Sequence, residues 1–300
     1  MNSFAQKDNT VLIEKLRIRT PLGMRFWDHG ANEPIRDQLT VTAWPRAGAP
    51  TPTYAVRNPA GIYAFHDLPG LREWEYPVED EDYDSSPPVN RQFIVKVEDN
   101  QNRYLKAAAI VEAPQPGDGL FGNTVSSPPM GEKGFRLFSA PTRPIKSHLA
   151  VVRAYLWDIS QNKYAAHAVL KVSIIGLETT WVGIADENGM TAVMFPYPLT
   201  MQSIDVSPPS SRIPIHEQSW KISVRAFYGG TDMRLLPNTG LPNLANIIQQ
   251  KKAKIFETAV TSKEGITGDL ELGKELILRT LHTAEEHSAK LLIEPLNSIS

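Results

Sequence analysis

The segment Thr179–Pro198 constrains the fold more than any other part of the chain, because it has the pattern of two strands joined by a tight turn. β-forming residues flank the turn residues Asp186–Gly189 on both sides, and Pro196 closes the second run. An Asn-Gly pair in this setting favours a two-residue turn in which both central residues have positive φ. Proline ends a strand because it has no N–H to donate. We therefore expect a hairpin with a primed turn at Asn188-Gly189.

A second copy of this pattern lies upstream, at Asn58–Pro69. It has the same order of turn, glycine (Gly61), alternating strand and closing proline. A Trp-Asp pair precedes each copy at a similar distance along the chain, at Trp27-Asp28 and at Trp157-Asp158. Two spaced matches predict a duplicated β-sandwich unit.

The length and the spacing of chain breakers predict a mainly β protein of two domains. A chain of 300 residues can bury two cores, and its 24 prolines and 19 glycines are spread among short alternating runs. We expect two β-sandwich domains with few short helices, joined by a linker rich in proline and glycine. The predicted division is a disordered tail at residues 1–10, the first sandwich at 11–113, the linker at 114–148 and the second sandwich at 149–300.

The second domain is expected to contain one helix and, near its end, two further strands. Leu244–Lys252 is the best helix candidate, with Asn243 as its N-cap and apolar residues on one face. Glu275–Leu281 and Lys290–Glu294 fit a final hairpin or a helix, and the alternation within the first of them favours strands.

Composition excludes several classes of function. The net charge of −2 leaves no basic footprint for nucleic acid, and no apolar run reaches the roughly 18–20 residues of a membrane span. The chain has no cysteine, which excludes disulfides and thiol chemistry. The first ten residues have no apolar signal-peptide core. These features favour synthesis and assembly in the cytoplasm.

No motif in the chain carries a convincing catalytic, cofactor or metal site. Gly117–Gly122 matches the dinucleotide pattern G-x-G-x-x-G, but prolines surround it and a flexible turn explains it better. Asp158 and Asp186 are interpreted as turn caps rather than paired acids. The seven histidines are scattered along the sequence. We therefore expect no enzyme activity, no cofactor and no bound metal.

The tryptophans leave an alternative open. Trp27, Trp44, Trp157, Trp181 and Trp220 all fall in strand-like runs. Core filling is the favoured role, because tryptophan buries a large area. Stacking against sugars is the second interpretation, and a row of exposed aromatic rings on one sheet face would favour it.

Several motifs resemble known families. Ala185–Gly189 through Pro196 resembles the signature of transthyretin-like or carboxypeptidase-regulatory-like β-sandwiches. This resemblance implies that the two sandwich domains are of the transthyretin-like or immunoglobulin-like type. A longer series of segments is similar to an accessory protein of extracellular contractile injection systems, the phage-tail-like particles of bacteria. The segments that carry this resemblance are Leu22–Asp28, Leu137–Pro144, Ala150–Ala154, Trp181–Asp186 and Leu272–Thr280. The resemblance implies a structural part at or near the baseplate, without enzymatic activity.

Two features are candidate contacts for the neighbouring baseplate, sheath or tube subunits that the resemblance implies. The apolar group of Phe135, Leu137 and Phe138 lies in the expected linker, and an acidic run contains Glu79, Asp80, Glu81 and Asp82. Apolar anchors would supply affinity and charges would supply orientation. The apolar group packing against the chain's own second domain is an equal alternative. A carbohydrate- or surface-binding sandwich is the alternative function. The expected location is a large particle that is assembled in the cytoplasm and later associates with a membrane or is released; the sequence leaves open whether the particle acts inside the cell, at a membrane or outside. No direct membrane span is expected.

Overall fold

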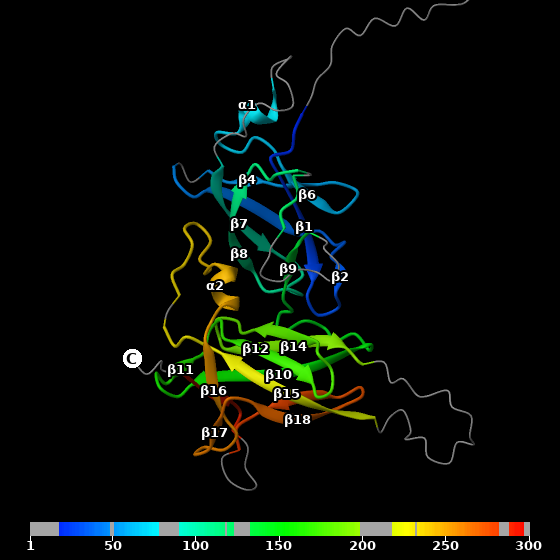
Figure 1. Ribbon diagram of the computed structural model, residues 1–300, viewed down its shortest axis with the longest axis vertical. Coiled ribbons are helices and arrows are strands. Elements are labelled where there is room, and N and C mark those ends of the chain that lie inside the picture. The colour runs from blue at the N-terminus through cyan, green and yellow to red at the C-terminus, as the bar shows by residue number, and fades with distance from the viewer. Residues whose placement is uncertain are drawn as a thin grey trace, which may run out of the picture.

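The strands of this protein form two stacked lobes. The computed structural model describes residues 18–48, 51–77, 90–117, 119–122, 133–198, 218–231, 233–281 and 288–296. Within these ranges the chain is mainly β with two short helices, which confirms the predicted fold class. In Figure 1 the first lobe is drawn mostly in blue to teal, with its strand β9 in green, and the second lobe is drawn in green to red. The expected tail at residues 1–10 lies outside the described residues.

The first lobe is a sandwich of two sheets. One sheet has the order β2-β1-β6-β5, with β9 parallel to β1, and the other has the order β4-β3-β7-β8. Its strands are β1 (Leu22–Asp28), β2 (Glu33–Pro34), β3 (Thr40–Pro45), β4 (Thr53–Tyr54), β5 (Val56–Arg57), β6 (Ile62–Phe65), β7 (Arg91–Glu98), β8 (Ala107–Ala113) and β9 (Phe135–Leu137).

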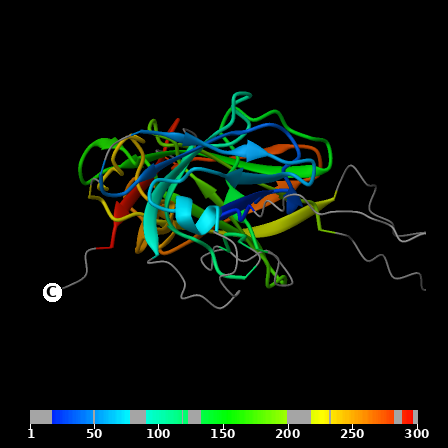
Figure 2. The ribbon, with the colours of Figure 1, turned by 90° about the horizontal axis from the view of Figure 1, so that it is seen from above.

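Aromatic side chains fill the space between these sheets. The Phe26 ring lies edge-on to Tyr63, with centroids 5.2 Å apart, and to Phe135 at 5.9 Å. From the opposite sheet Phe93 is buried in the same cluster. The short helix α1 (Arg72–Glu75) lies at the end of this lobe far from the second lobe, and Figure 2 shows it from that side.

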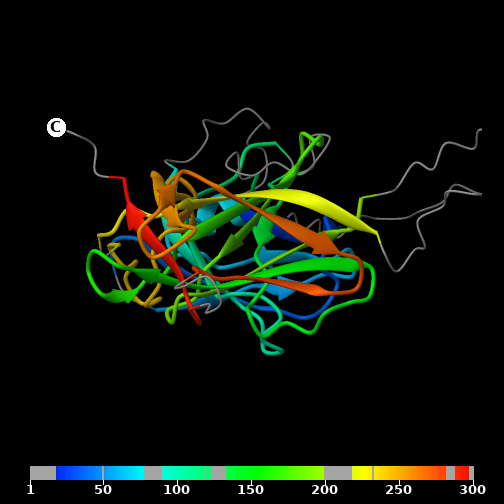
Figure 3. The ribbon, with the colours of Figure 1, turned by 90° about the horizontal axis from the view of Figure 1, so that it is seen from below.

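The second lobe is built around one long strand. The first part of β10 pairs with β14 and β19, and its last three residues pair with β11 and β20, so β10 passes from one layer to the other. Figure 3 shows the lobe from below. Its strands are β10 (Leu149–Asp158), β11 (Lys163–Tyr164), β12 (Val169–Ile174), β13 (Thr180–Ile184), β14 (Met190–Pro196), β15 (Ser219–Phe227), β16 (Lys252–Phe256), β17 (Ser262–Lys263), β18 (Ile266–Glu271), β19 (Glu275–Leu278) and β20 (Leu291–Pro295).

The helix of the second lobe reaches across to the first lobe. Helix α2 (Leu244–Ile248) begins where it was predicted, and the Asn243 side chain accepts a hydrogen bond from the backbone N–H of Ala245. The residues from the expected helix that follow Ile248 instead lead into β16. Asn243 forms a bridge with Ala108 of β8, so α2 is held beside the first lobe, as Figure 1 shows.

The first strands of the two lobes pair in the same way, as the predicted repeat requires. In the first lobe, β1 pairs antiparallel with β2, which follows the Trp-Asp turn, and with β6, which follows the glycine turn. In the second lobe, β10 pairs antiparallel with the corresponding strands β11 and β14. In each lobe it also pairs in parallel with later strands of the same lobe. The two sandwiches therefore share their strand pairing as well as their sequence pattern.

The glycine turns are also alike, but they are not primed turns. Gly189 has φ +74°, whereas Asn188 is not among the residues with positive φ, so the predicted turn type is wrong. The Gly189 N–H donates to the Asp186 carbonyl at 3.1 Å, and the Asp186 N–H donates to the Met190 carbonyl at 2.8 Å. These bonds define a turn with a single left-handed glycine, which resembles a type I turn followed by a bulge. Asn58 and Gly61 repeat the arrangement, with Gly61 at φ +78°.

Part of the expected linker belongs to the first lobe. Phe135–Leu137 is strand β9, which runs parallel to the end of β1. Gly119–Gly122 lies beside the start of β1, because Leu120 forms a parallel bridge with Gly23. The described residues of the apparent dinucleotide motif therefore border a sheet. The boundary at 114–148 is corrected accordingly, because only the short stretch between Phe138 and β10 connects the lobes.

The two final strands exist, but they do not form a hairpin. β19 and β20 both run parallel to β10, along different parts of that strand, and β20 also pairs with β16. The alternation predicted strands correctly here. The pairing of β19 with β20 was wrong because each strand bonds to a partner far away in the sequence.

Candidate functional site

The predicted apolar contact residues lie in the core. Phe135 and Leu137 are each 1% exposed and Phe138 is 3% exposed, and all three belong to the hydrophobic cluster of the first lobe. They are therefore buried within this chain rather than exposed as anchors, and their cluster, centred on the first lobe, also includes Val169 and Ile184 of the second lobe. The acidic candidates Glu79, Asp80, Glu81 and Asp82 lie outside the described residues.

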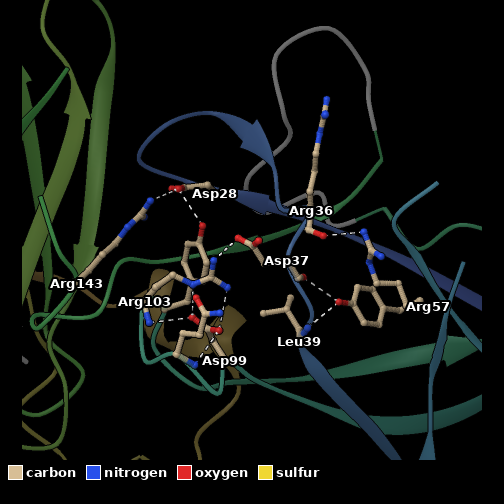
Figure 4. Close-up of polar contacts among 11 residues, drawn as sticks. Asp28, Arg36, Asp37, Leu39, Arg57, Asp99, Arg103 and Arg143 are labelled. Atoms are coloured by element: carbon tan, nitrogen blue, oxygen red, sulfur yellow. Dashed lines mark hydrogen bonds and ion pairs between the residues drawn. The ribbon is translucent and has the colours of Figure 1, made fainter. Parts of the chain in front are cut away.

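A buried ion pair joins the first lobe to the connecting segment. Arg143 Nη2 donates to Asp28 Oδ2 at 2.5 Å, and both side chains are almost fully buried. Tyr104 donates its hydroxyl to the same oxygen at 3.0 Å, and Arg143 Nη1 donates to Ser139 Oγ at 2.9 Å. Figure 4 shows Arg143 reaching Asp28 from a different part of the chain. Burial alone would raise the pKa of Asp28, but the hydrogen bond and charge of Arg143 hold that pKa below its ordinary value.

The other oxygen of Asp28 shapes the turn that meets the second lobe. Asp28 Oδ1 accepts hydrogen bonds from the backbone N–H groups of Gly30 at 2.8 Å and Ala31 at 3.1 Å. A side chain at Gly30 would place its Cβ 2.8 Å from the carbonyl oxygen of Met194 in β14. The turn is thus capped by an aspartate, and it packs closely against the second lobe.

A histidine spans the junction beside this turn. His29 Nε2 accepts a hydrogen bond from the Val182 backbone N–H at 3.0 Å, and its ring packs on Phe138 with centroids 4.8 Å apart. Burial, together with the nearby charge of Arg136, lowers the pKa of His29 to about 4. His29 is therefore neutral at pH 7 and joins the two lobes as a hydrogen-bond acceptor.

Apolar packing completes the junction. Val169 and Ile184 of the second lobe, with Leu244 and Ile247 of α2, belong to the same buried cluster as the core of the first lobe. On the other side of the connection, Arg153 of β10 bonds to the carbonyl of Pro141 and forms an ion pair with Glu275 of β19 at 2.7 Å. Some apolar side chains of the second lobe therefore join the core of the first lobe, while the rest of the second lobe packs around a separate core.

A cleft opens at this junction. Its volume is about 360 Å³, which is within the range of pockets that receive small molecules or a few side chains. Phe138, Leu241 and Ile247 form apolar walls, while His167 and Glu187 add polar groups. His167 has φ +60°, and burial lowers its pKa. No group of three or more metal-ligating side chains occurs here or elsewhere in the described ranges.

An aromatic cluster lies on a different surface, on β10 and β11. The Trp157 and Tyr164 rings are 5.0 Å apart, and Tyr155 lies 5.5 Å from Tyr164, which is 42% exposed. The Lys290 ammonium sits 3.0 Å from the centroid of the Trp157 ring. The hydrogen bond from Tyr164 raises the pKa of Tyr155 to about 12. Such a cluster can stack flat faces of a ligand, although Lys290 covers one face of Trp157.

Comparisons with known proteins leave the family open. No protein-family model and no curated protein matches the chain. Among solved structures, a TIE protein of Bacillus anthracis is 8% identical, with a TM-score of 0.23 over 88% of this chain and 51% of that one. This chain thus spans about half the length of that protein. GBS52, a minor pilin of Streptococcus agalactiae, is 9% identical, with a TM-score of 0.22 over 92% of both chains. Similarities this weak carry no functional argument.

The sequence predicted the turn aspartates but missed their partners. Asp158 Oδ1 accepts from the backbone of Ser160 at 2.8 Å, and Asp186 Oδ1 accepts from the backbone of Asn188 at 2.9 Å. Both therefore cap turns, as expected. Nothing in the sequence pairs Asp28 with Arg143, because the two residues are far apart and each is common in loops. Among helices in the described ranges, none is long and apolar enough to cross a membrane.

Proposed function

We propose that this protein is a non-enzymatic structural subunit of a contractile injection particle, at or near its baseplate. It acts through contacts with baseplate, sheath or tube subunits, and it is assembled into the particle in the cytoplasm. The observation that carries the proposal is the packed junction between the two lobes, where the Asp28–Arg143 ion pair, the His29 hydrogen bond and shared apolar contacts join the two sandwiches.

The segments that carry the sequence resemblance support this proposal, because they meet at the junction. They supply the Asp28 turn, the segment that carries Arg143, strand β10 with Arg153, strand β13 with Val182, and strand β19 with Glu275. A part that transmits force between neighbours needs such a fixed joint, since a flexible connection would let each lobe move separately. The resemblance therefore falls on the residues that hold the lobes together.

The proposal is tested by deleting the protein from the producing cell and imaging the particles by electron microscopy. We expect incomplete particles or particles that fail to contract, and recovery when the wild-type protein is supplied. An Arg143→Met variant should restore particles less well, because it breaks the joint. Arg279→Gln, at an exposed position on the second lobe, is the matched control and should restore them fully. Particles of full composition and normal contraction in the deletion strain would refute the structural role.

A carbohydrate- or surface-binding function is the second candidate, and the aromatic cluster of Tyr155, Trp157 and Tyr164 favours it. Rings on the face of β10 and β11 provide a platform on which sugars could stack. The test is a glycan array with the purified protein and with a Trp157→Ala/Tyr164→Ala variant. Binding by the wild type that the double variant loses would support this function. An array without bound glycans would reject it.

A further inference from the structure

Three arginines line one basin on the surface of the first lobe. The basin has a volume of about 530 Å³ and is formed around Arg25 of β1, Arg36 of the β2–β3 connection and Arg57 of β5. Trp27 lies two residues after Arg25 and also lines the basin. Side chains two apart on a strand share a face, so the indole lies on the same face of β1 as the guanidinium.

None of the three arginines forms an ion pair with a described residue. This sets them apart from Arg103, Arg143 and Arg153, which all pair with carboxylates. Arginine stays protonated at any physiological pH, so three positive charges share the basin without a neutralising partner. In a chain whose net charge is −2, such a concentration of unpaired cations indicates a binding function.

The basin is also organised before any ligand arrives. Arg57 Nη2 donates a hydrogen bond to the backbone carbonyl of Arg36 at 2.7 Å, which holds one guanidinium in place. Figure 4 shows this bond and shows the Arg36 guanidinium extending away from the polar network around Asp37. The turn at Asn58–Gly61, fixed by its own hydrogen bonds, forms one wall. Side chains held in this way lose less freedom on binding.

The lining between the arginines is apolar. Pro34, Ile35 and Pro59 separate the charged groups around the basin. A free phosphate ion would satisfy guanidinium groups but would leave these surfaces uncovered. A peptide that alternates acidic and apolar side chains matches both features, because the guanidinium fork binds carboxylates in a bidentate manner.

We propose that this arginine basin binds a carboxylate-rich segment of a partner protein. The inference rests on the proposed function only in taking that partner to be a neighbouring subunit of the particle. Arg36 and Arg57 are exposed and meet the partner first, whereas Arg25 and Trp27 form the deeper part of the site.

The experiment measures binding of a fluorescent peptide of alternating glutamate and valine to the purified full-length protein by anisotropy. A peptide of alternating glutamine and valine is the control ligand. The test variant is Arg36→Gln/Arg57→Gln, and the control variant is Arg279→Gln, an exposed arginine on the other lobe. We expect the test variant to bind the glutamate peptide at least about tenfold more weakly, because it loses two charged hydrogen-bonding partners. Arg279→Gln should bind like the wild type, and the glutamine peptide should not bind.

Three results would overturn the proposal. They are equal binding of both peptides, equal loss of binding in the two variants, and displacement of the glutamate peptide by inorganic phosphate at equal concentration. The last result would assign the basin to a free anion. Because the assay uses purified protein, its outcome is independent of whether the chain is found in a particle.

Discussion

The two lobes share a turn and differ in what surrounds it. In the first lobe both oxygens of Asp28 have donors, including the guanidinium of Arg143. In the second lobe the equivalent Asp158 caps its turn through Oδ1, but its buried Oδ2 has no hydrogen-bond partner among the described residues. The local sequence therefore specifies the turn. Whether the aspartate also binds a distant segment depends on the side chains that the rest of the fold places around its second oxygen.

The largest expected effect on stability comes from removing the ion pair between Asp28 and Arg143 in the first lobe. Arg143→Met should lower the free energy of unfolding by about 3–5 kcal/mol, because it leaves the buried charge of Asp28 without its cation. Urea unfolding of the variant measures the loss. Replacing Asp28 as well, in Asp28→Asn/Arg143→Met, should recover part of the stability. A loss below about 1 kcal/mol for Arg143→Met would show that the pair does not hold the junction.

The glycine turns give the next comparison. A Cβ at Gly189 would lie 2.4 Å from the carbonyl oxygen of Leu156, whereas at Gly61 the nearest atom is 3.9 Å away, at the tip of Arg57. Both glycines have positive φ, so alanine is strained at either position. We expect Gly61→Ala to cost about 1–2 kcal/mol and Gly189→Ala about 3 kcal/mol or more. If thermal melts show the same loss of stability for both variants, the close approach of Gly189 to the carbonyl oxygen of Leu156 is not what limits substitution there.

The sequence predicted the features that depend on neighbouring residues better than the exact turn type. Period-two alternation and the spacing of breakers predicted the mainly β fold, and the repeated Trp-Asp and glycine patterns predicted the duplication. Those signals are local. The turn type was wrong because the Asp186 side chain accepts from the backbone of Asn188 and Met190, which leaves only Gly189 in the left-handed region.

The features that sequence reasoning missed depend on distant contacts. Phe135 and Leu137 pair through β9 with β1, which lies more than a hundred residues earlier in the chain. An apolar run flanked by prolines gives no information about such a partner, so the sequence left two interpretations equal, a contact for another subunit and packing against the second domain. The arginine basin was missed for the same reason, because Arg25, Arg36 and Arg57 come from separate elements and converge only in the fold.

The junction should also respond to acid through His29. The folded state holds the pKa of His29 at about 4, below the ordinary value of 6.5, so the unfolded chain takes up a proton first as the pH falls. The stability that His29 contributes is therefore complete above pH 6.5 and is lost as the pH falls toward 4. We expect a loss of about 1–2 kcal/mol between pH 7 and pH 5. His29→Gln should flatten this part of the pH profile of unfolding, and an unchanged slope would rule out His29 as the cause.

The smallest effect is expected in the second lobe. Asp158→Asn keeps the oxygen that caps the turn and changes only the atom that has no partner. Its free energy of unfolding should stay within about 0.5 kcal/mol of the wild type. Asp28→Asn, in contrast, should be clearly destabilising, because it weakens the pair with Arg143. Similar losses in both variants would remove the distinction between the two lobes.

The most direct measurement of the central claim is co-purification. Particles are isolated from the producing cell on a density gradient, and this protein is quantified beside the sheath and tube proteins. The account predicts that the chain sediments with the particle in constant proportion to those proteins. Recovery of the chain only at the top of the gradient, in cells that produce complete particles, would contradict its role as a structural subunit.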